Sequence, residues 1–136
     1  MAQPLDTNKV TEGIRVEVSS RYLPGESTPD EDHYVFAYDV RLANEGERQA
    51  KLVSRHWTVI DAEGKRHEVR GPGVVGETPV LDPGDLFKYT SFCPLNTRWG
   101  TMEGSYHMER NDGEPFDVEI GRFYLVADVP EPSRTV

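Results

Sequence analysis

The sequence predicts an all-β protein, an antiparallel β-sandwich of about seven or more short strands. Three observations lead to this class. Apolar residues alternate with polar ones along much of the chain, Gly and Pro separate these segments, and no window of eleven residues free of Gly and Pro has the spacing of an amphipathic helix. Strands with one apolar face must stack or close to bury it. A chain of 136 residues can do so as a sandwich of two sheets, which we favour, or as a small closed barrel.

Three segments show the two-residue period most clearly, and each predicts a strand. Ile14, Val16 and Val18 alternate with polar residues, segment 34–42 has apolar residues at every second position, and segment 116–120 repeats the pattern. Less regular patterns predict further strands at about 49–60, 66–70, 86–92, 105–109 and 123–126.

Segment 49–60 changes its apolar face partway along. Val53, Trp57 and Val59 favour one face, whereas Leu52 and Ile60 favour the other. One extra residue in a strand shifts the alternation by one position, so this pattern predicts a β-bulge.

Turn residues connect the predicted strands at the spacing expected of hairpins. Gly permits a positive φ, and Pro fixes the φ of a turn position. The predicted turns contain Pro24-Gly25, Asn44-Glu45-Gly46, Glu63-Gly64, Pro83-Gly84 and Asn111-Asp112-Gly113.

A single domain is expected over residues 13–128, because no linker, repeat or low-complexity segment divides them. Residues 1–12 carry no period and are expected to form a flexible N-terminus. Residues 129–136 contain two prolines and no strand pattern, so a flexible tail is expected there.

Composition excludes several classes of function. The 15 Lys and Arg residues face 24 Asp and Glu, a formal net charge of −9, so the surface repels a phosphate backbone and no direct nucleic-acid partner is expected. No apolar run approaches the ~20 residues of a membrane helix, and no signal segment opens the chain. We therefore expect a cytoplasmic protein that does not enter a membrane.

The residues that usually carry catalysis do not form a recognisable set. The sequence has no G-x-S-x-G motif, and the only cysteine, Cys93, has no histidine nearby, so it is expected to fill space in the core. The four histidines form no close pair, and the acidic runs are typical of solvated loops. We predict a protein that is not an enzyme and that holds no metal or cofactor.

A glycine-rich segment, 71–76, has the G-x-G-x-x-G spacing of dinucleotide-binding folds. Two prolines, Pro79 and Pro83, follow where the phosphate-binding helix would begin, so this class is excluded. Two interpretations stay open: a tight loop with valines packed beneath it, or a nest of backbone N–H groups that binds an anion. The predicted anion site consists of Arg70, Gly71, Gly73 and Gly76.

Segment 93–104 combines a cation, an aromatic ring and a methionine in a predicted loop. Such residues are enriched at contact surfaces, so Arg98, Trp99 and Met102 are candidates for binding a partner. The alternative is a loop folded over one end of the core. Exposed sheet edges also leave open the pairing of two copies into a homodimer.

Several linked motifs of the chain resemble the ApaG family in order and spacing, over nearly all of residues 13–126. One departure is Phe92, where a small residue is expected. The motifs are Ser54-Arg55-His56-Trp57, Val69-Arg70-Gly71-Pro72-Gly73-Val74-Val75-Gly76, Pro79-Val80-Leu81-Asp82-Pro83-Gly84, Tyr89-Thr90-Ser91, and Gly100-Thr101-Met102-Glu103-Gly104-Ser105-Tyr106.

The resemblance implies a fold like that of fibronectin type III or immunoglobulin domains. It also implies an indirect link to cobalt and magnesium resistance, and a glycine-rich loop, suggested to bind pyrophosphate-like groups, at Gly71, Gly73 and Gly76. We predict a binding domain that contacts a protein partner or a small ligand. The alternative is direct binding of a divalent cation or a pyrophosphate-like anion, the anion through the loop from Gly71 to Gly76.

Overall fold

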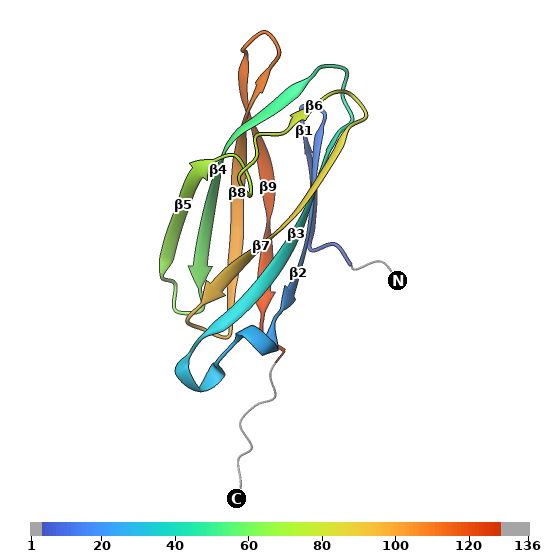
Figure 1. Ribbon diagram of the computed structural model, residues 1–136. Helices are drawn as coiled ribbons and strands as arrows, with labels where there is room; N and C mark the ends of the chain where they lie inside the picture. The colour runs from blue at the N-terminus through green and yellow to red at the C-terminus, as the bar shows by residue number, and fades with distance from the viewer. Residues whose placement is uncertain (1–3, 129–136) are drawn as a thin grey trace, which may run out of the picture.

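Two antiparallel sheets packed face to face form the protein, and the computed structural model describes residues 4–128 (Figure 1). The first sheet has the order β1-β2-β3-β7, with β1 at Thr7–Thr11, β2 at Ile14–Tyr22, β3 at Tyr34–Asn44 and β7 at Leu86–Leu95. The second has the order β5-β4-β8-β9, with β4 at Ala50–Asp61, β5 at Arg66–Pro72, β8 at Trp99–Arg110 and β9 at Pro115–Val126. A short strand β6, Val80–Leu81, also pairs with β4, and two 3₁₀ turns, Pro24–Glu26 and Pro29–Glu31, precede β3.

The predicted β-sandwich is confirmed, but several predicted boundaries were wrong. The predicted strands 116–120 and 123–126 form one strand, β9, and most of the predicted loop 93–104 belongs to β7 and β8. Residues 7–11, expected in the flexible N-terminus, form β1. The expected tail, 129–136, lies outside the described residues.

Glycines inside β8 and β9 interrupt the alternation of side chains, and they allow neighbouring atoms to approach closely. A Cβ built on Gly104 would lie 2.0 Å from the backbone oxygen of His56 on β4. A Cβ on Gly121 would lie 2.1 Å from the Thr7 hydroxyl oxygen on β1.

The predicted bulge lies in β4, where the pairing with β8 shifts register between Leu52 and Ser54. Leu52 and Trp57 are five positions apart, so a regular strand would place them on opposite faces. The shift lets both enter the core, where both are buried. After the bulge, the inward positions of β4 are Arg55, Trp57 and Val59.

An aromatic cluster at the centre of the sandwich fixes the ring of Trp57. The Tyr38, Tyr106 and Phe123 rings approach it with centroid distances of 5.3, 6.4 and 6.0 Å, all in edge-on geometry. Such pairs stabilise beyond the area they bury, by roughly 0.5–1.5 kcal/mol each. Trp57 therefore has little room to change rotamer.

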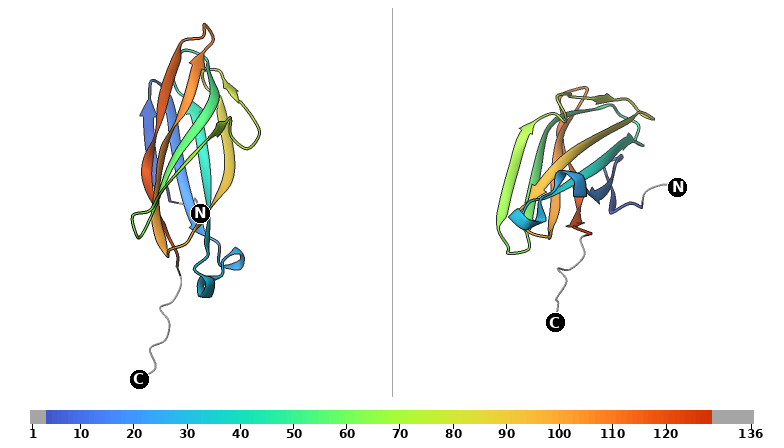
Figure 2. Two further views of the ribbon diagram at one scale, coloured as in Figure 1. Left: turned by 90° about the vertical axis from the view of Figure 1, so that its left-hand side faces the viewer. Right: turned by 60° about the horizontal axis from the view of Figure 1, so that its bottom comes forward.

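The two long sides of the sandwich differ. On one side β1 lies against β9, where Lys9 Nζ is 2.8 Å from Glu119 Oε1 and the Glu119 N–H donates to the Thr11 hydroxyl. On the other side the edge strands are β5 and β7, and every residue of β5 is at least partly exposed (Figure 2). The sheets are thus closed along β1 and β9 and open along β5 and β7.

Within residues 4–128, no helix has the length and apolarity to cross a membrane.

Candidate functional site

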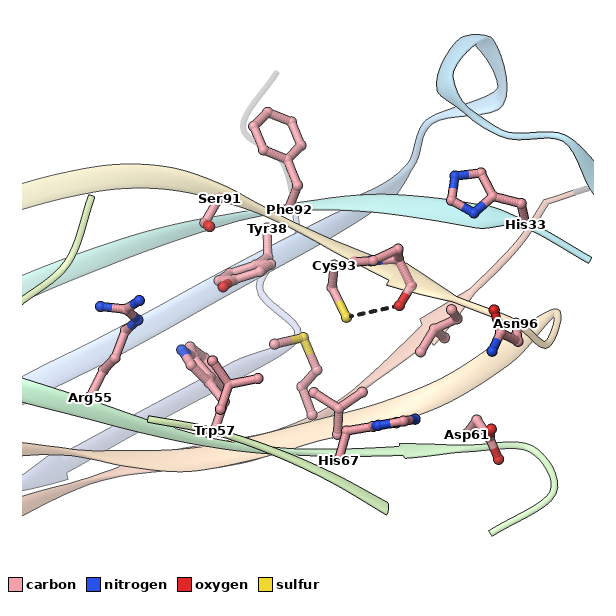
Figure 3. Close-up of a pocket in the computed structure, with 15 residues that line it drawn as sticks. His33, Tyr38, Arg55, Trp57, Asp61, His67, Ser91, Phe92, Cys93 and Asn96 are labelled. Atoms are coloured by element: carbon pink, nitrogen blue, oxygen red, sulfur yellow. Dashed lines mark hydrogen bonds between the residues drawn. The ribbon is translucent and has the colours of Figure 1, made fainter. Parts of the chain in front are cut away.

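A cleft of about 650 Å³ enters the sandwich along its open side (Figure 3). One wall consists of the inward side chains of β4 and β5, and the other of the inner face of β7 with Tyr38 of β3. Its volume lies within the range of roughly 300–1,000 Å³ typical of small-molecule sites. This cleft is the candidate functional site.

The register between β4 and β5 pairs the inward residues of the two strands, and all of them except Gly71 line the cleft. Arg55 is opposite Gly71, Trp57 is opposite Val69, and Val59 is opposite His67. Val69 is 43 % exposed although it faces the space between the sheets. A closed sandwich would bury that position, so its exposure follows from the open edge.

The middle of the cleft is apolar. Cys93 and Leu95 of β7 face Met102 of β8 and Val59 of β4 across it. Burial raises the pKa of the Cys93 thiol to about 11, so the thiol is neutral and unreactive near pH 7. Cys93 belongs to the core, as predicted.

The inner end of the cleft contains an unsatisfied hydrogen-bond donor. Trp57 is 2 % exposed, and its indole Nε1 is buried without a hydrogen-bond partner. Among the buried side-chain nitrogen and oxygen atoms of residues 4–128, this atom alone lacks one. Leaving such a donor unpaired costs roughly 1–3 kcal/mol, so it needs an explanation.

Arg55 extends along the same end of the cleft, and the indole nitrogen lies on the side of the Trp57 ring that faces it (Figure 3). Its guanidinium donates to the carbonyl oxygens of Pro72 and Gly73, both at 2.9 Å. Within the described part of the chain, Arg55 forms no ion pair with a carboxylate. A Cβ on Gly71 would lie 2.9 Å from the Arg55 guanidinium, so this glycine provides the space that the guanidinium occupies.

Three tyrosine hydroxyls lie near Arg55. The Tyr89 and Tyr106 hydroxyls form a hydrogen bond across the core, between β7 and β8. Burial raises the pKa of Tyr38, Tyr89 and Tyr106, while the positive charge of Arg55 acts against each rise. The hydroxyls therefore stay protonated and can donate hydrogen bonds.

The tyrosine hydrogen bond leads to a prediction. Tyr89→Phe leaves the Tyr106 hydroxyl, which is fully buried, without its partner, and should lower the free energy of unfolding by about 1–3 kcal/mol. Adding Tyr106→Phe removes the orphaned group, so the double variant should lose less than the sum of the two single variants. Urea denaturation of the four proteins measures this coupling, and strictly additive losses would contradict it.

The opposite face of β4 and β5 carries a polar cluster around Glu68. Its carboxylate accepts a hydrogen bond from Thr58 Oγ1 at 2.9 Å, lies 2.9 Å from His56 Nε2, and pairs with Arg66 at 3.0 Å. These groups lower the pKa of Glu68 from 4.5 to about 2. The cluster faces solvent and has no contact with the cleft.

This cluster predicts part of the acid sensitivity. Because the pKa of Glu68 is lower in the folded protein, its contribution to stability is complete above pH 4.5 and is lost as the pH falls toward 2. Glu68→Gln should flatten the melting temperature across that interval and leave the other carboxylates unchanged. Carbon-detected NMR titration would refute the assignment if Glu68 titrated near 4.5.

The predicted anion site is divided by the structure. Arg70 lies on the outer face of the second sheet, in a shallow depression shared with His56 and His107. In the loop, the Gly73 N–H donates to Val53 O, and Val74 and Glu77 exchange two backbone hydrogen bonds. Among the described residues, the N–H groups of Val75 and Gly76 donate no hydrogen bond, and both residues have positive φ. The anion nest predicted at Arg70, Gly71, Gly73 and Gly76 stays a prediction, now limited to these two amides.

The predicted partner residues are also separated. Met102 is 2 % exposed and reaches solvent only through the cleft, whereas Trp99 is 45 % exposed. Trp99 is cross-strand to Val126, and Tyr124 lies on the same outer face of β8 and β9, so the three form an apolar patch there. The Arg98 carbonyl accepts a hydrogen bond from the Ala127 N–H. Partner binding through this region remains a prediction.

The histidines have separate roles. His33 and His67 line the mouth of the cleft, and His107 Nδ1 lies 3.0 Å from Asp117 on the outer face. Within residues 4–128, no three His, Cys, Asp or Glu side chains gather closely enough to hold a metal ion. Phe92, the departure from the family pattern, is exposed at the edge of the cleft, and its ring is turned away from the other side chains that line it (Figure 3).

The two sheets and the open cleft define a small β-sandwich domain of the fibronectin type III or immunoglobulin-like type. The sequence pattern of the ApaG domain matches residues 24–110. The chain belongs to the ApaG family.

Proteins named ApaG have similar sequences over most of this chain. A protein called ApaG from Anaeromyxobacter dehalogenans (strain 2CP-C) is 53 % identical over 86 % of this chain and 92 % of its own length. One from Methylobacterium sp. (strain 4-46) is 51 % identical, covering 93 % and 95 % of the two chains. A crystal structure of an ApaA protein from Bordetella pertussis superposes with a TM-score of 0.82 at 45 % identity, covering 94 % of this chain and 98 % of that one.

Proposed function

We propose that this ApaG domain is a non-catalytic binding module that takes a small ligand into the cleft between β5 and β7. The observation that carries the proposal is the open side of the sandwich. There, Val69 faces the interior and is still 43 % exposed, above a cleft of about 650 Å³. A concave, mostly apolar space with a few polar groups is the usual form of a small-molecule site.

The chemistry of the cleft favours binding over catalysis. Its thiol is buried with a raised pKa, and burial raises the pKa of its tyrosine, Tyr38, which therefore stays protonated. Neither group can act as a nucleophile or base near pH 7. In this proposal the link to cobalt and magnesium resistance is indirect, through whatever the ligand regulates.

The two tryptophans provide the test. In ¹⁵N-labelled protein, Trp57 and Trp99 each give one indole N–H signal, the first from the wall of the cleft and the second from the outer face. A screen of small aromatic and aliphatic fragments, both charged and neutral, should give compounds that shift the Trp57 signal and leave that of Trp99 in place.

A matched pair of variants makes the screen specific. Val69→Phe narrows the mouth of the cleft and should weaken every such compound, whereas Val80→Phe, at an exposed valine outside the cleft, should not. A library that produces no shift of Trp57 at millimolar concentration would overturn the proposal.

The second candidate function is anion binding at the glycine-rich loop. The observation favouring it is the pair of adjacent amides at Val75 and Gly76, with φ of 44° and 82°, in the loop that follows β5. Consecutive N–H groups of this kind can form an anion nest. Pyrophosphate titrated into the same labelled protein should shift these two amides, and an unchanged loop would exclude the site.

A further inference from the structure

We infer that the cleft selects an anionic ligand, a carboxylate or phosphate group attached to a small apolar body, and that Arg55 and the Trp57 indole bind the anion. This inference rests on the proposed function of the cleft and adds the chemical class of its ligand. It follows from the polar groups at one end of the cleft and the apolar groups in its middle.

The inner end of the cleft carries the positive charge of Arg55. The chain has a formal net charge of −9, with 24 acidic residues available to pair its cations. Arg55 nevertheless points into the cleft (Figure 3), and among residues 4–128 its guanidinium donates to the carbonyl oxygens of Pro72 and Gly73 and pairs with no carboxylate. Guanidinium groups form their strongest hydrogen bonds with carboxylates and phosphates, so the inner end of the cleft has a cation without a counter-ion.

The same end of the cleft contains the unpaired indole N–H of Trp57. Trp57 Nε1 is buried and without a partner, although almost all buried polar atoms in folded proteins have one. The indole nitrogen lies on the side of the ring toward Arg55 (Figure 3), so a group that enters this end of the cleft can accept its hydrogen bond. An anionic oxygen there would satisfy Trp57 and neutralise Arg55 together.

The other titratable groups do not oppose this assignment. His33 and His67 lie at the mouth, where protonation would only add positive charge. The carboxylate of the cleft, Asp61, lies at the opposite end from Arg55 (Figure 3). Its Oδ1 accepts hydrogen bonds from the Glu63 and Lys65 amides, both at 2.9 Å, so it is engaged in the turn after β4.

The apolar body of the ligand follows from the rest of the cleft. Val59, Val69, Cys93, Leu95 and Met102 surround the space next to the polar end. A free inorganic anion would leave this surface uncovered. An aryl or alkyl group attached to the anion would bury it at roughly 25 cal/mol per Å².

The experiment compares anionic probes with neutral ones. Benzoate and phenyl phosphate, two sources of the same anionic chemistry, are titrated into the ¹⁵N-labelled full chain beside the neutral benzamide, which has nearly the shape of benzoate, and the neutral benzyl alcohol. Both anions, or the one whose size fits, should shift the Trp57 indole signal and bind roughly tenfold or more tightly than the neutral probes. Equal affinity for charged and neutral probes would overturn the anion assignment while the cleft remained a binding site. No shift of Trp57 with any probe would overturn both proposals.

Two variants identify the groups. Arg55→Met keeps the aliphatic stem and should abolish the preference for the anion without changing the affinity for benzamide. Arg70→Met is the matched control, because Arg70 lies on the neighbouring strand and points to the opposite face of the sheet. Trp57→Phe should reduce benzoate affinity while the amide spectrum remains that of a folded chain and the melting temperature falls far less than in Trp57→Ala. Loss of binding in Arg70→Met but not in Arg55→Met would place the anion on the outer face and contradict the inference.

Discussion

Replacing Gly104 by alanine is expected to destabilise the protein by roughly 3 kcal/mol or more, which for a chain of this size lowers the melting temperature by about 10 °C. Gly104 of β8 pairs with Trp57 of β4, and a Cβ there would lie 2.0 Å from the His56 backbone oxygen and 3.1 Å from the Trp57 Cα. The clashing atoms belong to the backbone, so no rotamer change relieves the overlap. The two central strands of the second sheet would have to separate.

Two other glycines separate the steric effect from the conformational one. A Cβ on Gly25 would meet nothing within 4 Å, so Gly25→Ala should change the free energy of unfolding by less than about 0.5 kcal/mol. Gly113 is equally open but has a φ of 88°, so its replacement should cost about 1–2 kcal/mol through backbone strain alone. Thermal denaturation of the three variants measures the ranking. A loss at Gly104 no larger than that at Gly113 would contradict the close approach of β4 and β8.

The same glycines show what could be predicted of the fold from the sequence. Alternation of apolar and polar residues was enough for the sandwich, for the strand containing Tyr38, and for the bulge near Val53. It failed at Gly100, Gly104 and Gly121, where a missing side chain reflects a close contact with another strand. Such contacts depend on which strands become neighbours, and a single sequence does not encode that order locally.

The candidate site was only partly predictable for a related reason. The sequence drew attention to the glycines of the loop, and the structure assigns Gly71 a packing role beside the Arg55 guanidinium. The available signal was Arg55 itself, a charged residue in the same alternating series as Trp57 and Val59. Its inward orientation can be recognised only after the bulge is placed. The cleft is open because the edge strands β5 and β7 lie apart. No local pattern in the sequence predicts the separation of these two strands.

The second large effect is expected at Trp57, where the size of the loss should depend strongly on the replacement. Trp57→Ala removes the ring at the centre of the aromatic cluster and should cost about 3–5 kcal/mol through lost burial and the cavity left behind. Trp57→Phe retains most of the contacts with Tyr38 and Phe123. It also removes a buried N–H that has no partner, so part of its packing loss is offset, and a cost of roughly 1–2 kcal/mol is expected.

Trp99→Phe provides the matched control, because this tryptophan is 45 % exposed and its replacement should change stability by less than about 0.5 kcal/mol. Urea denaturation of the ligand-free chain distinguishes the outcomes. If Trp57→Phe were as costly as Trp57→Ala, the indole nitrogen would have to make a stabilising hydrogen bond in the free protein. The difference in stability between the two Trp57 variants should widen when benzoate is present at saturation, because the ligand stabilises only the protein that binds it. Phenylalanine cannot donate to the anion, but it preserves the apolar wall of the cleft, so Trp57→Phe should retain a weakened response that Trp57→Ala loses.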